Sequence, residues 1–131
     1  MINRDPIKLS AEGPASATRL HEILNDPGRL PEWSSLAAKV NSVTGDTVEA
    51  EAPGGSRTIS YEYEPARSHL VIRTKRDTFP QQFSFEFRDQ SGKVRIDAEI
   101  FPGGEITDDA RAELRKSVEA DLARLIQKAR G

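Results

Sequence analysis

The chain has 131 residues, of which 36% are apolar and 31% are charged, a composition typical of a globular protein with one compact core. Lys and Arg number 19 against 21 Asp and Glu, and the net charge of −2 offers no clustered positive charge for binding nucleic acid. The absence of cysteine excludes disulfides, thiolate nucleophiles and cysteine-ligated metal sites. We therefore expect a single domain over residues 1–131, with no nucleic-acid partner.

No stretch of the sequence has the character of a targeting or membrane-spanning segment. The first ten residues, "MINRDPIKLS", lack the apolar run of a signal peptide. A run of ~18 apolar residues, the length needed to span a bilayer, occurs nowhere in the chain. The expected location is therefore the cytoplasm, and the oligomeric state stays open.

The chain begins with a predicted strand and a predicted helix. Residues 7–12, "IKLSAE", alternate apolar and polar side chains as a half-buried strand does, and Gly13-Pro14 ends the pattern. Residues 15–24 then carry apolar side chains at helical spacing. Pro27 disfavours helical conformation in the residue before it, so the helix is expected to end there.

A second short helix is expected within residues 29–37, "RLPEWSSLA". Pro31 is tolerated in the first turn of a helix, because its missing N–H would have no partner there. Trp33, the only tryptophan of the chain, would then fold back toward the core.

The middle of the sequence predicts six further strands in an antiparallel meander. Each segment has strand-like composition or alternation, and turn-forming sequences such as "PGGS", "PARS" and "DQSG" separate them. The six segments are residues 38–44, 47–52, 57–64, 69–74, 82–87 and 93–100. Alternation places one set of apolar side chains on a single face, namely Ile59, Tyr61, Tyr63, Phe83, Phe85, Phe87, Val94, Ile96, Ala98 and Ile100.

The C-terminal residues from Thr107 onward predict one long helix. Thr107 is a suitable N-cap, and Asp108 and Asp109 complement the positive end of the helix dipole. An apolar stripe at i, i+3 and i+4 spacing is formed by Leu114, Val118, Leu122, Leu125 and Ala129. A long meander and one striped helix pack most economically when the sheet curls around the helix.

This order of elements resembles the START-like helix-grip superfamily (SRPBCC), which includes polyketide cyclases and dehydrases, birch-pollen-allergen relatives and coenzyme-Q-binding proteins. The resemblance covers almost the whole chain. Its most recognisable segment is an Asp-Pro, short spacer, Leu-Pro-x-Trp corner, formed here by Asp26, Pro27, Leu30, Pro31 and Trp33. The expected fold class is thus α+β: a seven-stranded antiparallel sheet wrapped around a long C-terminal helix, with two short helices after the first strand.

The same resemblance implies a role for this corner. In the superfamily it supports the long helix and closes one side of a cavity. Trp33 would pack the short helices against the sheet, with its indole N–H on a backbone carbonyl or water. We favour this packing role over a ligand contact, because buried aromatic side chains usually serve packing.

One end of the predicted sheet is a candidate opening. Alternate turns of a meander fall on the same side, so residues 53–56, 75–81 and 101–106 share one end with the start of the long helix. That end carries two Gly-Gly pairs and two loop aromatics, Phe79 and Phe101, as the mouth of a pocket would. The alternative is that the glycines only fit bends and the phenylalanines seal the end of the sheet.

The inward strand positions combine large rings with small side chains such as Ala50 and Ala98. Such positions either interdigitate into a solid core or leave an apolar cavity, and the residues alone favour a solid core. The family resemblance implies a small cavity instead. The side chains expected to contact a ligand are Tyr61, Tyr63, Phe79, Phe83, Phe85, Ile96, Phe101, Leu114 and Val118. Other polar groups that can turn inward are Thr74, Ser117 and Asp121, although each can simply bond backbone or water.

No cofactor and no metal site is predicted. Neither Gly-Gly pair matches a phosphate-binding loop. His21 and His69 have no Asp or Glu at metal-ligand spacing and no nucleophile motif beside them. Both histidines are therefore expected at the surface or at a rim, and no catalytic residue is assigned.

Three functions are compatible with the sequence. The first is binding or carriage of a small hydrophobic or amphipathic ligand, such as a lipid, a quinone or a polyketide-like molecule. The second is a polyketide cyclase or dehydratase, in which Tyr61 or Tyr63 would donate to a carbonyl and Asp121 would act as the base. The third is a protein-interaction domain of the co-chaperone kind, which requires an exposed apolar patch. We expect binding without turnover, because the inward candidates are mostly hydroxyls that titrate near ~10 when unperturbed.

Overall fold

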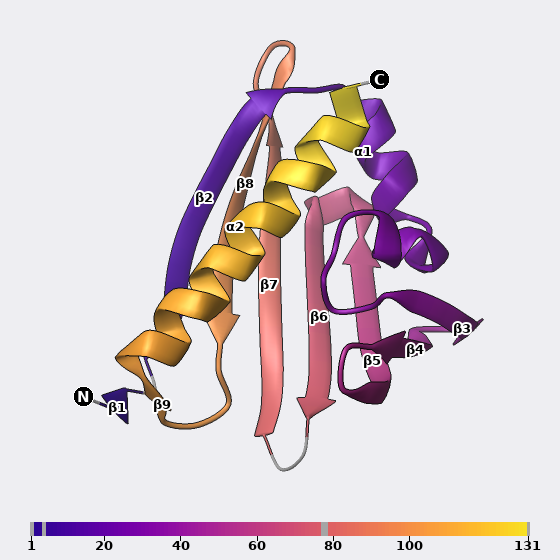
Figure 1. Ribbon diagram of the computed structural model, residues 1–131. Helices are drawn as coiled ribbons and strands as arrows, with labels where there is room; N and C mark the ends of the chain where they lie inside the picture. The colour runs from indigo at the N-terminus through magenta and orange to yellow at the C-terminus, as the bar shows by residue number, and fades with distance from the viewer. Residues whose placement is uncertain (1, 4, 77–78, 131) are drawn as a thin grey trace.

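The computed structural model describes residues 2–3, 5–76 and 79–130, without the side chains of residues 2–3, 75–76 and 79–80. Seven strands form one antiparallel sheet in the order β2-β8-β7-β6-β5-β4-β3, and the long helix α2 crosses its concave face (Figure 1). The predicted α+β helix-grip class is therefore confirmed. The bounds are β2 Ile7–Pro14, β3 Lys39–Thr44, β4 Thr47–Ala52, β5 Gly55–Glu64, β6 His69–Arg76, β7 Phe79–Asp89, β8 Lys93–Phe101 and α2 Asp108–Arg130.

Two short helices, α1 (Ala17–Leu24) and η1 (Pro27–Glu32), connect β2 to β3. Ser16 caps α1, and Asp26 caps η1 by accepting a hydrogen bond from the Gly28 N–H at 3.0 Å. The predicted start of the second helix at residue 29 is thus wrong by two residues. Pro27 occupies the first helical position, which suits its fixed φ, so the Asp26 cap decides where the helix begins.

The hairpin between β6 and β7 is longer than predicted. Residues 75–76 and 79–81 were expected in a loop, but they pair across the hairpin, with Arg76 opposite Phe79. Pro80 therefore lies inside a strand, opposite Lys75. Two further strands of two residues each, β1 (Ile2–Asn3) and β9 (Ile106–Thr107), pair with each other. Such short pairs carry too little alternation to be recognised in a sequence.

The helix α2 is buried over its C-terminal part only. The buried side chains of its stripe are Val118, Leu122, Leu125, Ile126 and Ala129. Between residues 108 and 117 no side chain is buried, and Leu114 is half-buried. Thr107 Oγ1 accepts from the Ala110 N–H at 3.1 Å, as expected for the cap. Among the described residues, no helix is both long enough and apolar enough to cross a membrane.

The stability of the fold is expected to depend on the buried stripe of α2. Leu122 is 0% exposed in the core between helix and sheet, so Leu122→Ala should lower the free energy of unfolding by about 2–5 kcal/mol. Urea denaturation measures this change. Lys116→Ala, at an exposed position of the same helix, is the control and should stay within about 0.5 kcal/mol of wild type. Equal stability of the two variants would contradict the assignment of the core.

Candidate functional site

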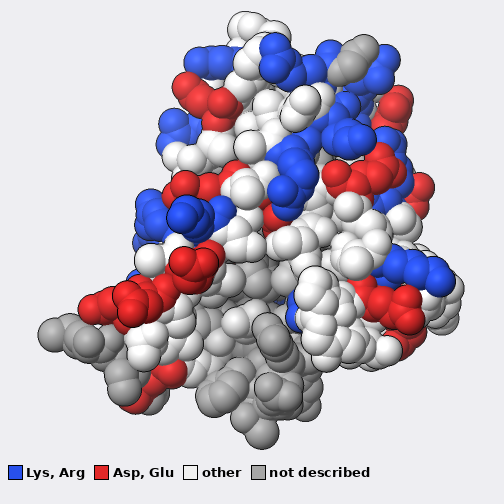
Figure 2. All heavy atoms as spheres, in the orientation of Figure 1, with Lys and Arg blue, Asp and Glu red and all other residues white. Residues whose placement is uncertain are grey.

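A hollow of about 310 Å³, which we call the central pocket, lies between the N-terminal half of α2, the sheet and the loop after η1. Its apolar wall consists of Phe83 and Phe85 from β7, Leu114 and Val118 from α2, and Trp33, Leu36 and Pro53. Its polar wall consists of Ser34, Ser35, Arg57, Gln81, Ser117 and Asp121. In Figure 2 the surface beside the lower half of α2 is hollowed and mostly uncharged. The volume lies at the lower end of the range for small-molecule sites.

The loop after η1, residues Trp33–Leu36, forms one wall of the pocket, and we call it the bridging segment. Asp121 on α2 accepts hydrogen bonds from the Ser35 backbone N–H and the Ser35 hydroxyl, each at 3.1 Å. Arg124 Nε donates to the Trp33 carbonyl at 3.3 Å. From the opposite side, Arg57 Nη1 on β5 donates to the Leu36 carbonyl at 3.3 Å. The bridging segment is therefore held to both α2 and the sheet.

Asp121 is a buried carboxylate at this wall, with 5% of its surface exposed. Its second oxygen, Oδ1, forms an ion pair with Arg124. Burial raises the pKa of the Asp121 carboxyl, and the hydrogen bonds from Ser35 oppose that rise. The Ser35 hydroxyl lies 3.1 Å from the Ser117 hydroxyl and gives its one proton to Asp121, so Ser117 donates to Ser35. This chain of hydroxyls can pass a proton between the pocket and Asp121.

Trp33 packs against the sheet, as expected. Its ring is 1% exposed and meets Phe85 edge-on, with the ring centroids 6.2 Å apart. Its Nε1–H donates to no protein atom in the described part of the chain, so the predicted backbone carbonyl is not its partner there. Thr74, which pairs in register with the pocket residue Gln81, likewise has a buried hydroxyl without a partner among the described residues.

The structure brings together only part of the predicted ligand-contacting set. Phe83, Phe85, Leu114 and Val118 line the central pocket. Ile96 is instead fully buried in the core, and half-buried Phe101 lies outside the pocket lining. The side chain of Phe79 lies outside the described residues, so the opening expected at Phe79 and Phe101 stays a prediction. Pro53, Gln81 and Leu36 line the pocket at the predicted end of the sheet.

The two tyrosines lie at the other end of β5 and anchor α1. The Tyr61 hydroxyl donates to the Leu24 carbonyl at 2.6 Å, and burial raises the pKa of this phenol. The Tyr63 hydroxyl lies 2.9 Å from His21 Nδ1, beside a second hollow of only about 110 Å³. Burial also raises the pKa of Tyr63. The prediction that these hydroxyls face the same pocket as Asp121 is wrong, because alternation assigns a face of the strand but no position along it.

Arg57 is the functional candidate that the sequence analysis missed. It has the same parity as Ile59 and Tyr61, so its side chain projects toward the concave face. The alternation that identified those residues also applied to Arg57, but only apolar side chains were counted. Ser34, Ser35 and Leu36 lie in an irregular loop, where no periodicity marks which side chains turn inward.

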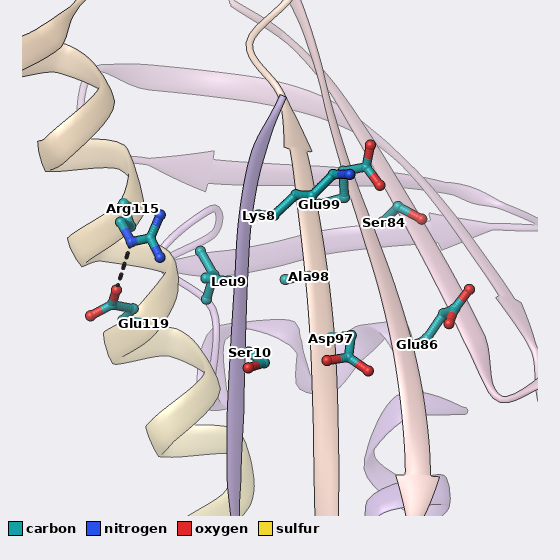
Figure 3. Close-up of a pocket in the computed structure, with 10 residues that line it drawn as sticks. All are labelled: Lys8, Leu9, Ser10, Ser84, Glu86, Asp97, Ala98, Glu99, Arg115 and Glu119. Atoms are coloured by element: carbon teal, nitrogen blue, oxygen red, sulfur yellow. Dashed lines mark hydrogen bonds and ion pairs between the residues drawn. The ribbon is translucent and has the colours of Figure 1, made fainter. Parts of the chain in front are cut away.

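A larger hollow of about 580 Å³, the outer groove, lies along β2, β8 and β7. Figure 3 shows Leu9 pointing toward α2, whereas Lys8, Glu86 and Glu99 point away from the helix. Arg115 pairs with Glu119 at 3.2 Å, and Arg88, outside the lining, pairs with Glu86 and Asp97. Leu9 and Ala98 are the two apolar side chains of this lining, and its many charged and polar groups are typical of a solvated sheet surface. The central pocket is therefore a better candidate for a small-molecule site than the outer groove.

The described surface offers no large apolar patch for a protein partner. Val43, with 43% exposure, is the one large apolar side chain classed as exposed among the described residues. Isolated surface apolar residues are ordinary in monomeric proteins. His69, one of the two predicted rim histidines, bonds the Ser84 hydroxyl at 2.8 Å, and His21 is exposed.

Comparisons with known proteins establish the fold. No protein-family model matches the chain, and no curated protein matches its sequence. XoxI from Bacillus cereus matches with a TM-score of 0.75 at 15% identity over 95% of both chains. A START superfamily protein from Mycobacterium smegmatis matches with a TM-score of 0.58 at 17% identity over 92% of both. The di-domain ARO/CYC BexL, from the BE-7585A biosynthetic pathway, matches with a TM-score of 0.63 at 11% identity, over 98% of this chain and 52% of BexL. The chain therefore has the START-like helix-grip fold.

The raised pKa of Asp121 predicts a pH-dependent stability. A carboxyl with a raised folded-state pKa stabilises the fold most below its unfolded pKa of about 3.9, and this contribution is lost as pH rises through the folded value. The free energy of unfolding of wild type minus that of Asp121→Asn should therefore fall as pH rises above the unfolded pKa of about 3.9, because asparagine does not titrate. Urea denaturation at several pH values measures it. In a Ser35→Ala background, which lacks one hydrogen-bond donor to the carboxylate, the same difference should fall more steeply with pH. A difference that rises with pH would contradict the raised pKa of Asp121.

Proposed function

We propose that the chain is a single cytoplasmic domain that binds a small amphipathic ligand in the central pocket and does not transform it. The observation that carries this proposal is the division of the pocket wall. Phe83 and Phe85 form an apolar side, and Ser35, Arg57 and Ser117 form a polar side of the same hollow. A mostly apolar pocket with a few convergent polar groups is the usual form of a small-molecule site.

The size of the pocket narrows the ligand. At about 310 Å³ the hollow suits a molecule of one or two rings rather than a long acyl chain. Aromatic rings such as Phe85 and Trp33 favour a flat, apolar group, which can meet them edge-on or offset. The names of two structural neighbours, a START superfamily protein and an ARO/CYC protein, agree with a ligand of this kind. Among the candidate ligands named above, a compact quinone or polyketide-like ring system therefore fits better than a lipid.

The test is binding of N-phenyl-1-naphthylamine, a neutral two-ring probe whose fluorescence rises in an apolar environment. Wild-type protein should bind it saturably. Leu114→Glu places a charge at the half-buried pocket wall and should weaken the affinity by about tenfold or more. Ala112→Glu adds the same charge at an exposed position of α2 and should leave the affinity unchanged.

Circular dichroism and thermal melting establish that both variants are folded before the affinities are compared. Loss of binding in Leu114→Glu alone would support the central pocket as the site. Equal affinities in the two variants, or no saturable binding to wild type, would contradict the proposal.

A second candidate, a cyclase or dehydratase activity, is favoured by one observation, the hydroxyl chain from Ser117 through Ser35 to buried Asp121. Proton transfer by a positioned group contributes about 10²–10⁴-fold to a rate, so Asp121→Asn should abolish turnover of an aromatic polyketide-type substrate if this activity exists. We expect no turnover by wild type. If wild type turns over such a substrate, and Asp121→Asn loses this turnover but still binds N-phenyl-1-naphthylamine, the carrier proposal is wrong and the chain is an enzyme.

A further inference from the structure

We infer that Gln81 determines the ligand specificity of the central pocket, and that its side-chain amide binds an uncharged carbonyl or hydroxyl group at the edge of an aromatic ring system. The inference rests on the proposed function, because it names the polar group of a ligand in the same pocket. It adds a recognition residue and a chemical class of ligand to the hollow that the proposed function assigns.

Gln81 differs from the other polar side chains of the pocket wall in having no partner. The other five are hydrogen-bonded to protein groups, namely Ser34, Ser35, Arg57, Ser117 and Asp121. The side chain of Gln81 lines the same hollow, but its amide makes no hydrogen bond to any described residue. Its two N–H donors and its carbonyl oxygen are therefore available to a ligand.

The strand β7 places this amide in line with two phenylalanines. Alternate residues of a strand share a face, so Gln81, Phe83 and Phe85 follow one another along the pocket wall. Neighbouring members of this row lie about 7 Å apart, a distance that one or two fused rings can bridge. A ring that packs on Phe83 can therefore place a substituent at Gln81.

The exposure of these side chains gives the ligand a direction. Phe83 and Phe85 are 2% and 3% exposed, whereas Gln81 is half-buried. Burial of apolar surface is most favourable where water is most completely excluded. The rings of the ligand would therefore lie against the phenylalanines, and its polar group would lie at the more accessible end of the row, beside Gln81.

The amide favours an uncharged group over an ion. It has donors and an acceptor but no charge, so it can satisfy a carbonyl or a hydroxyl group. Burial of an ion without a charged partner costs far more than burial of a neutral polar group. The charged wall residues do not offset this cost, because Asp121 is paired with Arg124 and Arg57 already has partners within the protein.

The hydrogen bonds of Gln81 would discriminate between ligands of the same shape. A ligand that covers this side chain removes its amide from water. A carbonyl or hydroxyl group of the ligand replaces the lost hydrogen bond, whereas an apolar isostere leaves the amide unsatisfied. Sites built to hydrogen-bond a ligand reject analogues that lack the bonding group for this reason.

The experiment measures displacement of N-phenyl-1-naphthylamine by naphthalenes that differ in one group. 2-Acetylnaphthalene carries a carbonyl, and 2-isopropylnaphthalene is its apolar isostere. The affinity ratio of this pair should favour the ketone about 2–10-fold more in wild type than in Gln81→Met, because methionine has a similar length but cannot form the hydrogen bonds of an amide. The anion 2-naphthoate should bind wild type more weakly than the ketone does.

Gln82→Met is the matched control. Gln82 is the next residue of β7 and points to the opposite face, where its Oε1 accepts a hydrogen bond from Arg73 Nε at 3.1 Å. This variant carries the same substitution one residue away, at a side chain outside the pocket lining. It should preserve the wild-type ratio.

Gln81→Glu distinguishes a direct contact from a structural effect. An ionised carboxylate only accepts hydrogen bonds, so at about pH 7.5 this variant should lose the preference for the ketone. It should keep a preference for 2-naphthol, which donates a proton, over 2-methylnaphthalene. A structural role of Gln81 would change both preferences together.

A measurement on wild type stands even if a variant fails to fold. In ¹H–¹⁵N spectra the side-chain NH₂ signals of Gln81 should shift more with saturating 2-acetylnaphthalene than with 2-isopropylnaphthalene. Equal shifts with the two compounds would contradict the hydrogen bond.

The outcomes separate this inference from the proposed function. Failure of N-phenyl-1-naphthylamine to bind wild type would contradict the proposed function itself. Saturable binding of this probe, with equal ratios in wild type and folded Gln81→Met, would overturn the role of Gln81 and leave the pocket intact. An equal loss of preference in Gln82→Met, or tighter binding of 2-naphthoate than of the ketone, would overturn it as well.

Discussion

The central pocket depends on a buried carboxylate that must keep its hydrogen bonds. Asp121 is the only buried acid among the described residues, and an unpaired charge at that depth would be costly. Ser35 and Arg124 satisfy it, and in doing so they tie the bridging segment to α2. These bonds hold the loop at the wall of the hollow, across from Phe83 and Phe85. The space of about 310 Å³ between helix and sheet is therefore bordered by a loop with fixed hydrogen-bond partners.

The hydrogen bonds between α2 and the bridging segment lie near the boundary between two parts of α2 that have different roles. Leu122 and Leu125 are fully buried against the sheet and stabilise the fold, whereas Leu114 and Ser117 line the pocket at its N-terminal half. A change in one part can therefore alter binding with little effect on folding. The START-like fold accommodates proteins with different roles, so function has to be argued from the pocket wall. Here that wall offers aromatic rings, hydroxyl groups and one guanidinium.

The sequence predicted the strands, the long helix and its Thr107 cap because each depends on a local period or a local hydrogen bond. The same reasoning placed Phe83, Phe85, Leu114 and Val118 correctly on inward faces. It failed for Tyr61 and Tyr63, because β5 is ten residues long and its ends lie roughly 30 Å apart. It also missed Ser35, whose position follows from a tertiary bond to Asp121 that no sequence period encodes.

The most direct test of the ligand site is a ¹H–¹⁵N NMR titration with N-phenyl-1-naphthylamine. The chain has a single tryptophan, so one indole N–H signal reports on the pocket wall at Trp33. If the central pocket is the site, the Trp33 indole and the backbone amides of Ser35 and Leu36 should shift together and saturate at one concentration. Shifts confined to the outer groove along β2 and β8, with an unchanged Trp33 indole, would contradict it.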